Sequence, residues 1–258
     1  MSLLTHWEGE PVGVWSGMWG LPRLVVHGVV GSTNDEMRYL AGTTRLPTLT
    51  VVMAEEQTAG RGRSGAAWVA PVGTALLASI FVRIPTSAPP LHLPLAVGVA
   101  VARALEGAAP GIVAGIKWPN DVEIAGRKVA GILCESAPGG VVVGIGINVR
   151  DAGAALPETV RERAVSLEGA AGTPVARSAV MGRLLAELRP VLVGADGGAG
   201  LPEDLLAELQ RRDVLAGRAV LTRAGRGTAR GIAADGALLV DVGEQRATRV
   251  VAGSVRLA

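Results

Sequence analysis

Two series of apolar segments, which differ in length and spacing, limit the folds that this chain can adopt. The longer segments are rich in β-branched residues and predict strands, and segments with a helical pattern lie among them. Strands are predicted at residues 24–30, 48–57, 74–83, 112–118, 128–136 and 141–149. Helices are predicted at residues 91–106, 177–188 and 202–212, and after a Thr33-x-x-Glu36 capping box in which Ser32 or Thr33 is the cap. The pattern therefore predicts a main domain that contains both strands and helices.

The second series begins after residue 212, where the predicted strands become short. They occupy residues 217–222, 228–233, 237–242, 246–251 and 254–257, and Asp235-Gly236 forms a hairpin signal between two of them. Five short strands of this kind suggest a small β-barrel that docks on the main domain. We therefore divide the chain into residues 1–213 and 214–258, and expect residues 1–23, which hold Trp7, Trp15 and Trp19, to be irregular.

The composition excludes several classes of protein. With 49% hydrophobic residues and a formal net charge of +2, the chain is not expected to be disordered. Its longest apolar run, residues 91–102, ends at Arg103 and is too short to span a membrane, and the N-terminus lacks the pattern of a secretory signal. A single cysteine, Cys134, agrees with a reducing compartment, and the scattered arginines give no reason to expect nucleic-acid binding. We expect a soluble cytoplasmic protein.

A loop rich in glycine and arginine lies between the second and third predicted strands, at residues 57–68. It matches the dinucleotide pattern G-x-G-x-x-G, but a strand follows instead of a helix, and no acidic residue lies about 20 positions further on. We therefore reject that interpretation. Arg61 and Arg63 between glycines suit phosphate or carboxylate, although a solvated turn is an equal alternative.

The two lysines of the chain are a second candidate site. Of 25 basic residues only Lys117 and Lys128 are lysine, and both lie in the segment that contains Pro119, Asn120 and Asp121. Pro119 breaks the preceding strand and presents Asn120 and Asp121 at its end, where Asp121 could hold a magnesium ion or orient a lysine. The alternative for Asn-Asp after proline is an ordinary turn.

Asn148 ends the last long strand, in the sequence Gly144-Ile-Gly-Ile-Asn148. Its amide could contact a base or a metal-bound phosphate, and a strand-end cap is as good an interpretation. Cys134 lies in no recognisable motif, and the three scattered histidines support neither a catalytic triad nor a zinc site.

Taken in order, five motifs resemble the biotin protein ligase family, which includes biotin–[acetyl-CoA-carboxylase] ligases and holocarboxylase synthetases. They are GSTN at 31–34, AEEQTAGRGRSG at 54–65 followed by Trp68, KWPND at 117–121, GRKVAGIL at 126–133 and GIGINV at 144–149. The segments at 164–169 and 231–240 look like the family's later catalytic segment and C-terminal barrel. The resemblance implies an α+β fold, with a mixed-sheet catalytic domain and a small SH3-like β-barrel.

The resemblance also implies the reaction and its residues. Biotin would react with MgATP to give biotinyl-5′-AMP and pyrophosphate, and the biotinyl group would then pass to a lysine of a biotin carboxyl carrier domain. Lys128 would bridge the biotin carboxylate and the α-phosphate, with Arg61, Arg63 and Lys117 as further catalytic cations. Biotin would contact Ser32, Thr33, Asn34, Gln57, Gly60, Arg61, Arg63, Trp68, Lys128 and Gly131. ATP would contact Arg63, Lys117, Asn120, Lys128 and Asn148, and Asp121 would reach Mg²⁺ through phosphate. No prosthetic group is implied.

One position departs from the family, and two other functions stay open. Ala66 stands where the family often has another arginine, which puts one phosphate or ribose contact in doubt. Some members begin with a DNA-binding domain, and the residues before position 24 are too few for one, so DNA is not an expected partner. A membrane is not expected either, because no apolar run is long enough to span one, and a homodimer is left open. The alternatives are a lipoate or octanoate protein ligase, and a biotin-binding regulator without catalysis. A lipoate ring would leave Gln57, Ser32 and Thr33 unpaired, at a cost of roughly 1–3 kcal/mol per buried group.

Overall fold

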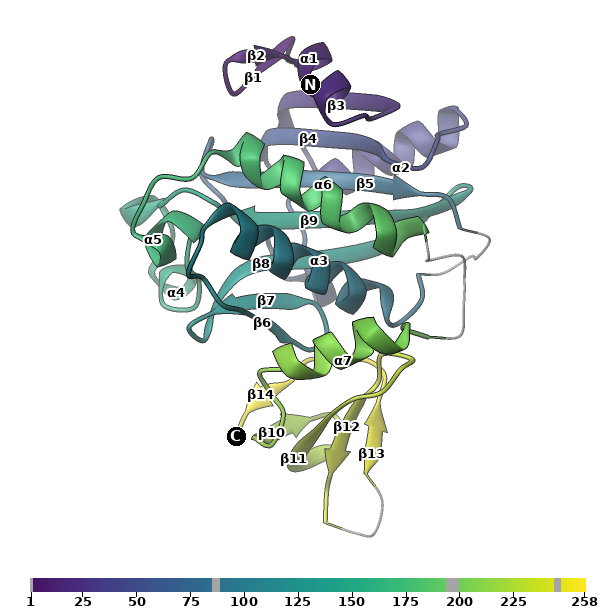
Figure 1. The fold of residues 1–258 in the computed structure, drawn as a ribbon, viewed down its shortest axis with the longest axis vertical. Coiled ribbons are helices and arrows are strands. Elements are labelled where there is room, and N and C mark those ends of the chain that lie inside the picture. The colour runs from purple at the N-terminus through teal and green to yellow at the C-terminus, as the bar shows by residue number, and fades with distance from the viewer. Residues whose placement is uncertain (1, 85–88, 194–199, 244–246) are drawn as a thin grey trace.

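A seven-stranded mixed sheet forms the centre of the computed structural model, which describes residues 2–84, 89–193, 200–243 and 247–258 (Figure 1). Along the sheet the order is β3-β4-β5-β9-β8-β7-β6, in which only β3 and β4 are parallel. The strands are β3 (Arg23–Val30), β4 (Thr50–Gln57), β5 (Ala75–Val82), β6 (Ala114–Lys117), β7 (Asp121–Ile124), β8 (Arg127–Ala137) and β9 (Gly140–Asn148). The expected mixed sheet is confirmed.

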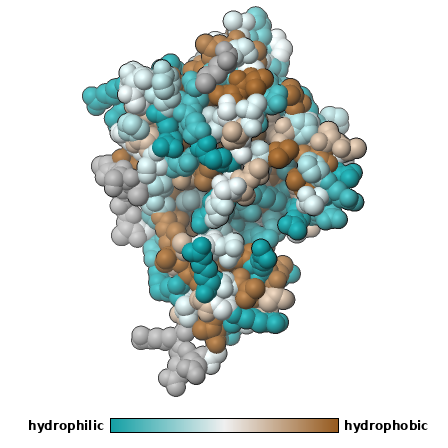
Figure 2. Space-filling model, turned by 180° about the vertical axis from the view of Figure 1, so that it is seen from behind, coloured by the Kyte–Doolittle hydropathy of each residue, from teal (hydrophilic) through white to brown (hydrophobic). Residues whose placement is uncertain are grey.

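Helices cover both faces of this sheet, but to different extents. Helices α3 (Leu93–Ala108) and α6 (Arg177–Val193) lie across one face (Figure 1), and α2 (Thr33–Thr43) packs on the other. Because side chains alternate along a strand, Val51 of β4 faces the α3 and α6 core while Val52 faces α2. Viewed from behind, the second face has a recess near its centre where hydrophilic residues gather (Figure 2).

The C-terminal part is a five-stranded antiparallel sheet of order β13-β12-β11-β10-β14. Its strands are β10 (Ala219–Thr222), β11 (Gly225–Ile232), β12 (Leu238–Asp241), β13 (Thr248–Val250) and β14 (Arg256–Leu257). Helix α7 (Glu203–Arg212) and one side of α3 share a hydrophobic core with this sheet, and Trp118 lies in that core. The indole Nε1 of Trp118 donates to the carbonyl of Gly236, 2.9 Å away. The small sheet is therefore packed directly on the segment that carries Pro119 and Asp121.

Several local predictions are corrected by the structure. Residues 1–23 are not wholly irregular, because β1 (His6–Trp7), β2 (Glu10–Pro11) and α1 (Val12–Met18) lie within them. Ser32, one of the two predicted caps, is the N-cap of α2 but makes no side-chain cap hydrogen bond, and the predicted Thr33 capping box is wrong, because the Thr33 hydroxyl donates to Gln57. The sequence also gave no expectation of β7, nor of the short helices η1 (Arg63–Gly65), η2 (Gly153–Ala155), α4 (Glu158–Arg161) and α5 (Leu167–Ala171).

One predicted strand extends beyond the described residues. The strand expected at residues 246–251 is present as β13, although its first residue, Arg246, lies outside the described residues. Within the described ranges, no helix has the length and apolar character needed to cross a bilayer.

Candidate functional site

A network of amides and hydroxyls lies where α2 begins against β4 and β5. The Thr33 backbone N–H and hydroxyl both donate to Gln57 Oε1, at 2.7 and 3.0 Å. The fully buried Ser79 hydroxyl lies 2.8 Å from Thr33 Oγ1 and 2.5 Å from Asn34 Oδ1, and Asn34 Nδ2 donates to Glu135 Oε2 at 2.7 Å. Because its oxygen is occupied, Gln57 has its Nε2 donors left for a ligand.

Glycines on two neighbouring strands make room above the sheet for Trp68 and Asn34. A Cβ on Gly146 would lie 2.5 Å from Trp68 Cε2, and one on Gly131 would lie 3.0 Å from Trp68 Cζ3. A Cβ on Gly144 would lie 2.3 Å from Asn34 Oδ1. The alternation of Gly144 and Gly146 with isoleucine thus keeps one strand face bare for the site and the other apolar for the core.

These groups line a cavity of about 210 Å³. Glycines of the sheet form one wall, Gln57 lies at an uncharged polar end, and Lys128 and Arg63 lie at a cationic end. Gly60 closes the loop over it, because the Gly60 carbonyl accepts from the Trp68 N–H at 2.9 Å and a Cβ there would lie 2.6 Å from the Trp68 carbonyl. Among the described residues, the buried indole Nε1 of Trp68 has no hydrogen-bond partner. The cavity therefore offers an unused donor on its apolar side.

Arg61 is held at the rim of this cavity by acidic side chains. Its Nη1 and Nη2 lie 2.5 and 2.6 Å from the two oxygens of Asp35, and Nη2 lies 3.5 Å from Glu135 Oε2. The hydrogen bonds that Arg61 donates to Asp35 lower the pKa of Asp35 and raise the pKa of Arg61. Both side chains are more than a third exposed, so solvent screens the pair.

Arg63 lines the same cavity without such a partner. Its guanidinium takes part in no ion pair or hydrogen bond within the described part of the chain, and burial lowers its pKa against the opposing field of Asp121. A partly desolvated cation with no counter-ion is a favourable place for a ligand anion. Ser64 beside it adopts a left-handed backbone, with φ of 54°, which forms the tight turn of η1.

The two lysines occupy different environments. Lys128 Nζ lies 2.6 Å from Asp121 Oδ1 and 5.4 Å from the centre of the Trp68 ring, and both Lys128 and Asp121 line the cavity. Lys117 does not line it: its Nζ lies 2.9 Å from Oε1 of the buried Glu123. The structure thus brings Lys128 to the cavity, whereas Lys117 pairs with Glu123 outside the cavity lining.

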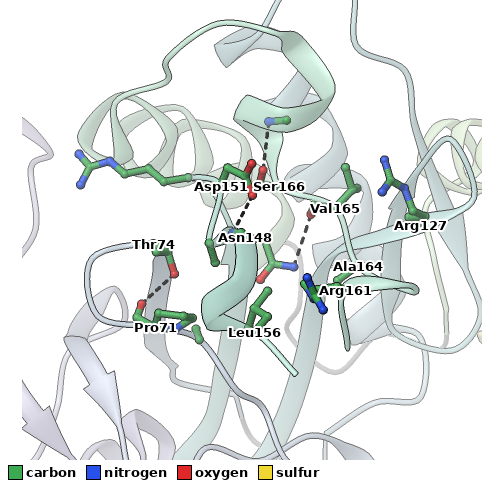
Figure 3. A pocket seen from close by; sticks show the side chains of 15 residues that line it. Pro71, Thr74, Arg127, Asn148, Asp151, Leu156, Arg161, Ala164, Val165 and Ser166 are labelled. Atoms are coloured by element: carbon green, nitrogen blue, oxygen red, sulfur yellow. Dashed lines mark hydrogen bonds between the residues drawn. The ribbon is translucent and has the colours of Figure 1, made fainter. Parts of the chain in front are cut away.

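A second cavity, of about 310 Å³, continues along the same face of β9 (Figure 3). Gly146 lines the first cavity and Asn148 the second, and residues two apart on a strand face are separated by roughly 7 Å. The Asn148 amide donates to the carbonyls of Val165 and Lys128, at 3.4 and 3.5 Å, which joins β9 to the segment before α5. Arg127 and Arg161 reach this cavity from separate segments (Figure 3).

Asn120 and Cys134 have mainly structural contacts. Asn120 lines the first cavity, but its Nδ2 donates to the Ile132 carbonyl at 2.8 Å and its carbonyl accepts from the Ile132 N–H at 3.0 Å. Burial raises the pKa of the Cys134 thiol to about 12, so it stays protonated at neutral pH and is a poor nucleophile.

Within residues 2–84, 89–193, 200–243 and 247–258, no cluster of three or more His, Cys, Asp or Glu could hold a metal ion.

Most residues predicted from the sequence meet at these two cavities. The first is lined by Ser32, Thr33, Asn34, Gln57, Arg61, Arg63, Trp68, Asn120, Asp121, Lys128 and Gly131, and the second by Asn148. Gly60 contacts the lining residue Trp68, and the Lys117 carbonyl accepts from the N–H of the lining residue Asn120 at 3.2 Å. Sequence reasoning missed Ser79, Glu135 and Asp35, which position the lining residues. A lone serine in the apolar run at residues 75–82 was a usable signal, because a buried hydroxyl needs a partner.

Comparison with known proteins identifies relatives of this chain. Residues 28–150 match the model of the biotin/lipoate A/B protein ligase family. The biotin–[acetyl-CoA-carboxylase] ligase of Mycobacterium tuberculosis is 36% identical over 250 residues, which cover 92% of this chain and 89% of that protein. The bifunctional ligase/repressor BirA of Bacillus subtilis is 38% identical over 169 residues; this match covers 63% of the chain and 51%, about half, of the relative.

A solved structure agrees over nearly the whole chain. The biotin protein ligase from Aquifex aeolicus in complex with biotin and ATP superposes with a TM-score of 0.80 at 27% identity, covering 92% of this chain and 100% of that chain.

Proposed function

The chain belongs to the biotin/lipoate A/B protein ligase family, and we propose that it is an ATP-dependent biotin protein ligase. The observation that carries the proposal is one cavity with an uncharged polar end at Gln57 and a cationic end at Lys128 and Arg63. Biotin has the same polarity, with a neutral ureido ring at one end and a carboxylate at the other.

The first step forms an acyl-adenylate. A biotin carboxylate oxygen attacks the α-phosphorus of ATP, a P–O bond forms, and the bond to pyrophosphate breaks. Two anions must approach for this attack, so fixed cations at their meeting point lower the barrier. We assign this role to Lys128, because its compact ammonium lines the cavity beside Asp121, and to Arg63 as the unpaired second cation.

The remaining residues of the first cavity orient biotin. We propose that Gln57 Nε2, Ser32 and the Thr33–Asn34 pair contact the ureido group, and that Trp68, Gly60 and Gly131 enclose the ring and chain. Arg61 would leave Asp35 to close over the carboxylate. Lys117 supports the site through Glu123, and Asn120 through the carbonyl and N–H of Ile132.

The nucleotide belongs in the second cavity. It adjoins the cationic end of the first through Lys128, whose carbonyl accepts from Asn148, and it adds Arg127 and Arg161. Apolar Leu156, Ala164 and Val165 beside Asn148 suit a base with polar edges. We propose that the adenylate lies along β9, with its phosphate near Lys128.

Magnesium fits this site only together with the phosphates. Among the described residues, Asp121 is the single carboxylate that lines the first cavity, and Mg²⁺ commonly takes one or two carboxylates while phosphates and water fill its other positions. Bound there, Mg²⁺ would neutralise phosphate charge. Asp121 also bonds Lys128, so it is a shared orienting group.

In the second step, the amine of a carrier lysine attacks the acyl carbon of the adenylate, an amide bond forms, and AMP leaves. The amine must lose a proton, and Asp121 is the nearest carboxylate to the cationic end that lines the cavity. We propose a biotin carboxyl carrier domain as the acceptor. We further propose that the protein is cytoplasmic and binds no nucleic acid. The catalytic domain would end at residue 213, with the small C-terminal domain at residues 214–258, and a homodimer is compatible with this proposal.

The lipoate alternative is disfavoured by the polar end of the cavity. The dithiolane ring of lipoate has no hydrogen-bonding group, so the Gln57 donors would lose water and gain no partner, at a cost of roughly 1–3 kcal/mol. A binding protein without catalysis would have no use for cations in both cavities.

Transfer to a carrier tests the proposal. The purified chain would be incubated with biotin, MgATP and a biotin carboxyl carrier domain, and the carrier analysed by intact mass and streptavidin blotting. We expect one biotinyl group on one lysine, which requires both small substrates and is absent from a carrier whose acceptor lysine is replaced by arginine. Unmodified carrier in the complete mixture would contradict the proposal.

A further inference from the structure

A buried ion cluster ties the Trp-rich N-terminal segment to the wall of the second cavity. Arg177 of α6 is almost fully buried, and its guanidinium bonds two carboxylates: Glu8 Oε1 at 2.6 and 2.9 Å, and both Glu55 oxygens at 2.9 Å. Trp7 lies over the same guanidinium, with 5.2 Å between Cζ and the ring centre. The N-terminal hairpin is therefore anchored in the main core.

Glu8 has a second partner, which belongs to the candidate site. Arg150 Nη2 lies 3.1 and 2.8 Å from the two Glu8 oxygens, and Arg150 Nη1 donates to the Gly73 carbonyl at 3.2 Å. Arg150 lines the second cavity, two residues after Asn148, and its backbone N–H donates to the Thr74 carbonyl at 2.8 Å. One carboxylate thus joins a cavity residue to a buried cation.

The backbone of Glu8 is held in an unfavourable conformation at this point. Its φ is 47°, in the left-handed region, where an asparagine or glycine would be less strained. The side chain is only 11% exposed, and its two carboxylate oxygens are both paired with arginines. A strained residue whose side chain joins two segments far apart in the sequence points to a positioning role.

We propose that Glu8 is a positioning residue for the nucleotide: by holding Arg150 against the Gly73 carbonyl, it fixes the wall of the second cavity. This inference rests on the proposed function and adds a role for the N-terminal segment. Within the described part of the chain, the Glu8 side chain pairs with Arg150 of the second cavity and with Arg177, and it forms no hydrogen bond or ion pair with a residue that lines the first cavity. Its loss therefore acts on ATP and leaves biotin binding unchanged.

The test is pyrophosphate exchange, with KM for ATP and KM for biotin measured separately in Glu8→Gln and in Arg150→Met. Glu8→Gln weakens both of its ion pairs, whereas Arg150→Met removes only the cavity partner and leaves Glu8, Arg177 and Glu55 paired. We expect each variant to raise KM for ATP by about 2- to 30-fold with little change in KM for biotin. Glu10→Gln, an exposed carboxylate of the same hairpin, is the matched control.

Two further results decide the inference. In the double variant, the two effects on KM for ATP must be less than additive, because both remove the same contact. An equal rise of both KM values, or a fall in kcat alone, would overturn the positioning role and assign Glu8 to stability only. Wild-type protein without biotin-dependent exchange would contradict the proposed function instead, so the two failures are distinguishable. If Glu8→Gln does not fold, Arg150→Met carries the same test.

Discussion

Lys128 and Asp121 form an ion pair, with Nζ 2.6 Å from Oδ1, beside the Trp68 ring that lines the first cavity. The register of β7 and β8 sets this contact, because a bulge between Val122 and Glu123 shifts the pairing so that Asp121 lies opposite Gly131. A glycine at that position leaves the space that the lysine side chain occupies, since a Cβ there would lie 2.9 Å from Nζ.

Replacement of Lys128 by arginine is expected to separate binding from chemistry. A planar guanidinium keeps the positive charge but fits poorly between two oxygens, so adenylate formation falls by about 100- to 1,000-fold while biotin affinity changes little. Single-turnover adenylation and calorimetric biotin binding measure the two effects. Lys117→Arg, which can keep the ion pair with Glu123, is expected to lose much less. Near-normal adenylation by Lys128→Arg would exclude Lys128 as the bridging cation.

Replacement of Asp35 by asparagine should release Arg61 from the rim. Because Arg61 holds the pKa of Asp35 below its ordinary value of 3.8, the pair stabilises the fold at higher pH and loses that effect as pH falls through the lowered pKa. At pH 7 we expect a loss of about 0.2–1 kcal/mol in the free energy of unfolding, since the pair is partly exposed. Urea denaturation at pH 7 and below pH 3 measures the difference. A difference that persists unchanged in acid would contradict the ion-pair account.

The same substitution tests the mobility of the Gly-Arg loop. Trypsin should cut after Arg61 or Arg63 faster in Asp35→Asn than in the unchanged protein, and biotin should slow the cleavage in both. Equal cleavage rates with and without biotin would argue against ordering of the loop by its ligand.

Addition of a methyl group at Gly146 should weaken biotin binding without unfolding the protein. The new Cβ would overlap the Trp68 ring, which lies on a loop and can move away from the cavity. An overpacking cost of this kind corresponds to about a 5- to 150-fold rise in Kd for biotin. Gly42→Ala has room for its Cβ and is the control. Unchanged affinity in Gly146→Ala would show that Trp68 does not cover biotin.

The contact between the C-terminal sheet and the start of α3 should be sensitive to Gly236. A Cβ there would lie 2.8 Å from backbone atoms of His92, and φ is 92°, so Gly236→Ala is expected to cost about 2–5 kcal/mol. Gly225→Ala, in the same small sheet with φ of 111° and open space, should show the smaller cost of backbone strain alone. Thermal unfolding of both variants makes the comparison. Equal losses of stability in the two variants would mean that the contact between Gly236 and His92 adds nothing to the cost of the substitution.

Local patterns predicted the parts of the site that lie on regular strands. The apolar, β-branched runs at residues 128–136 and 141–149 were sufficient to predict β8 and β9, whereas Lys128 was singled out by the scarcity of lysine and by the family resemblance. Strand β7 was missed because four residues beside a proline and a turn carry too little pattern.

Long-range contacts had no such signal. Glu8 and Arg150 are 142 residues apart, and nothing near either position indicates the other. The capping-box prediction failed for a related reason: Thr33 found better partners in Gln57 and Ser79, which only the sheet brings to it. Tertiary hydrogen bonds can override a local motif when they bury its side chain.

Pyrophosphate exchange into ATP, run with biotin and with lipoate side by side, tests the central claim most directly. The polar and cationic ends of the first cavity predict rapid exchange with biotin and MgATP, and negligible exchange with lipoate. Exchange with lipoate but not with biotin would contradict the assignment of the cavity to biotin.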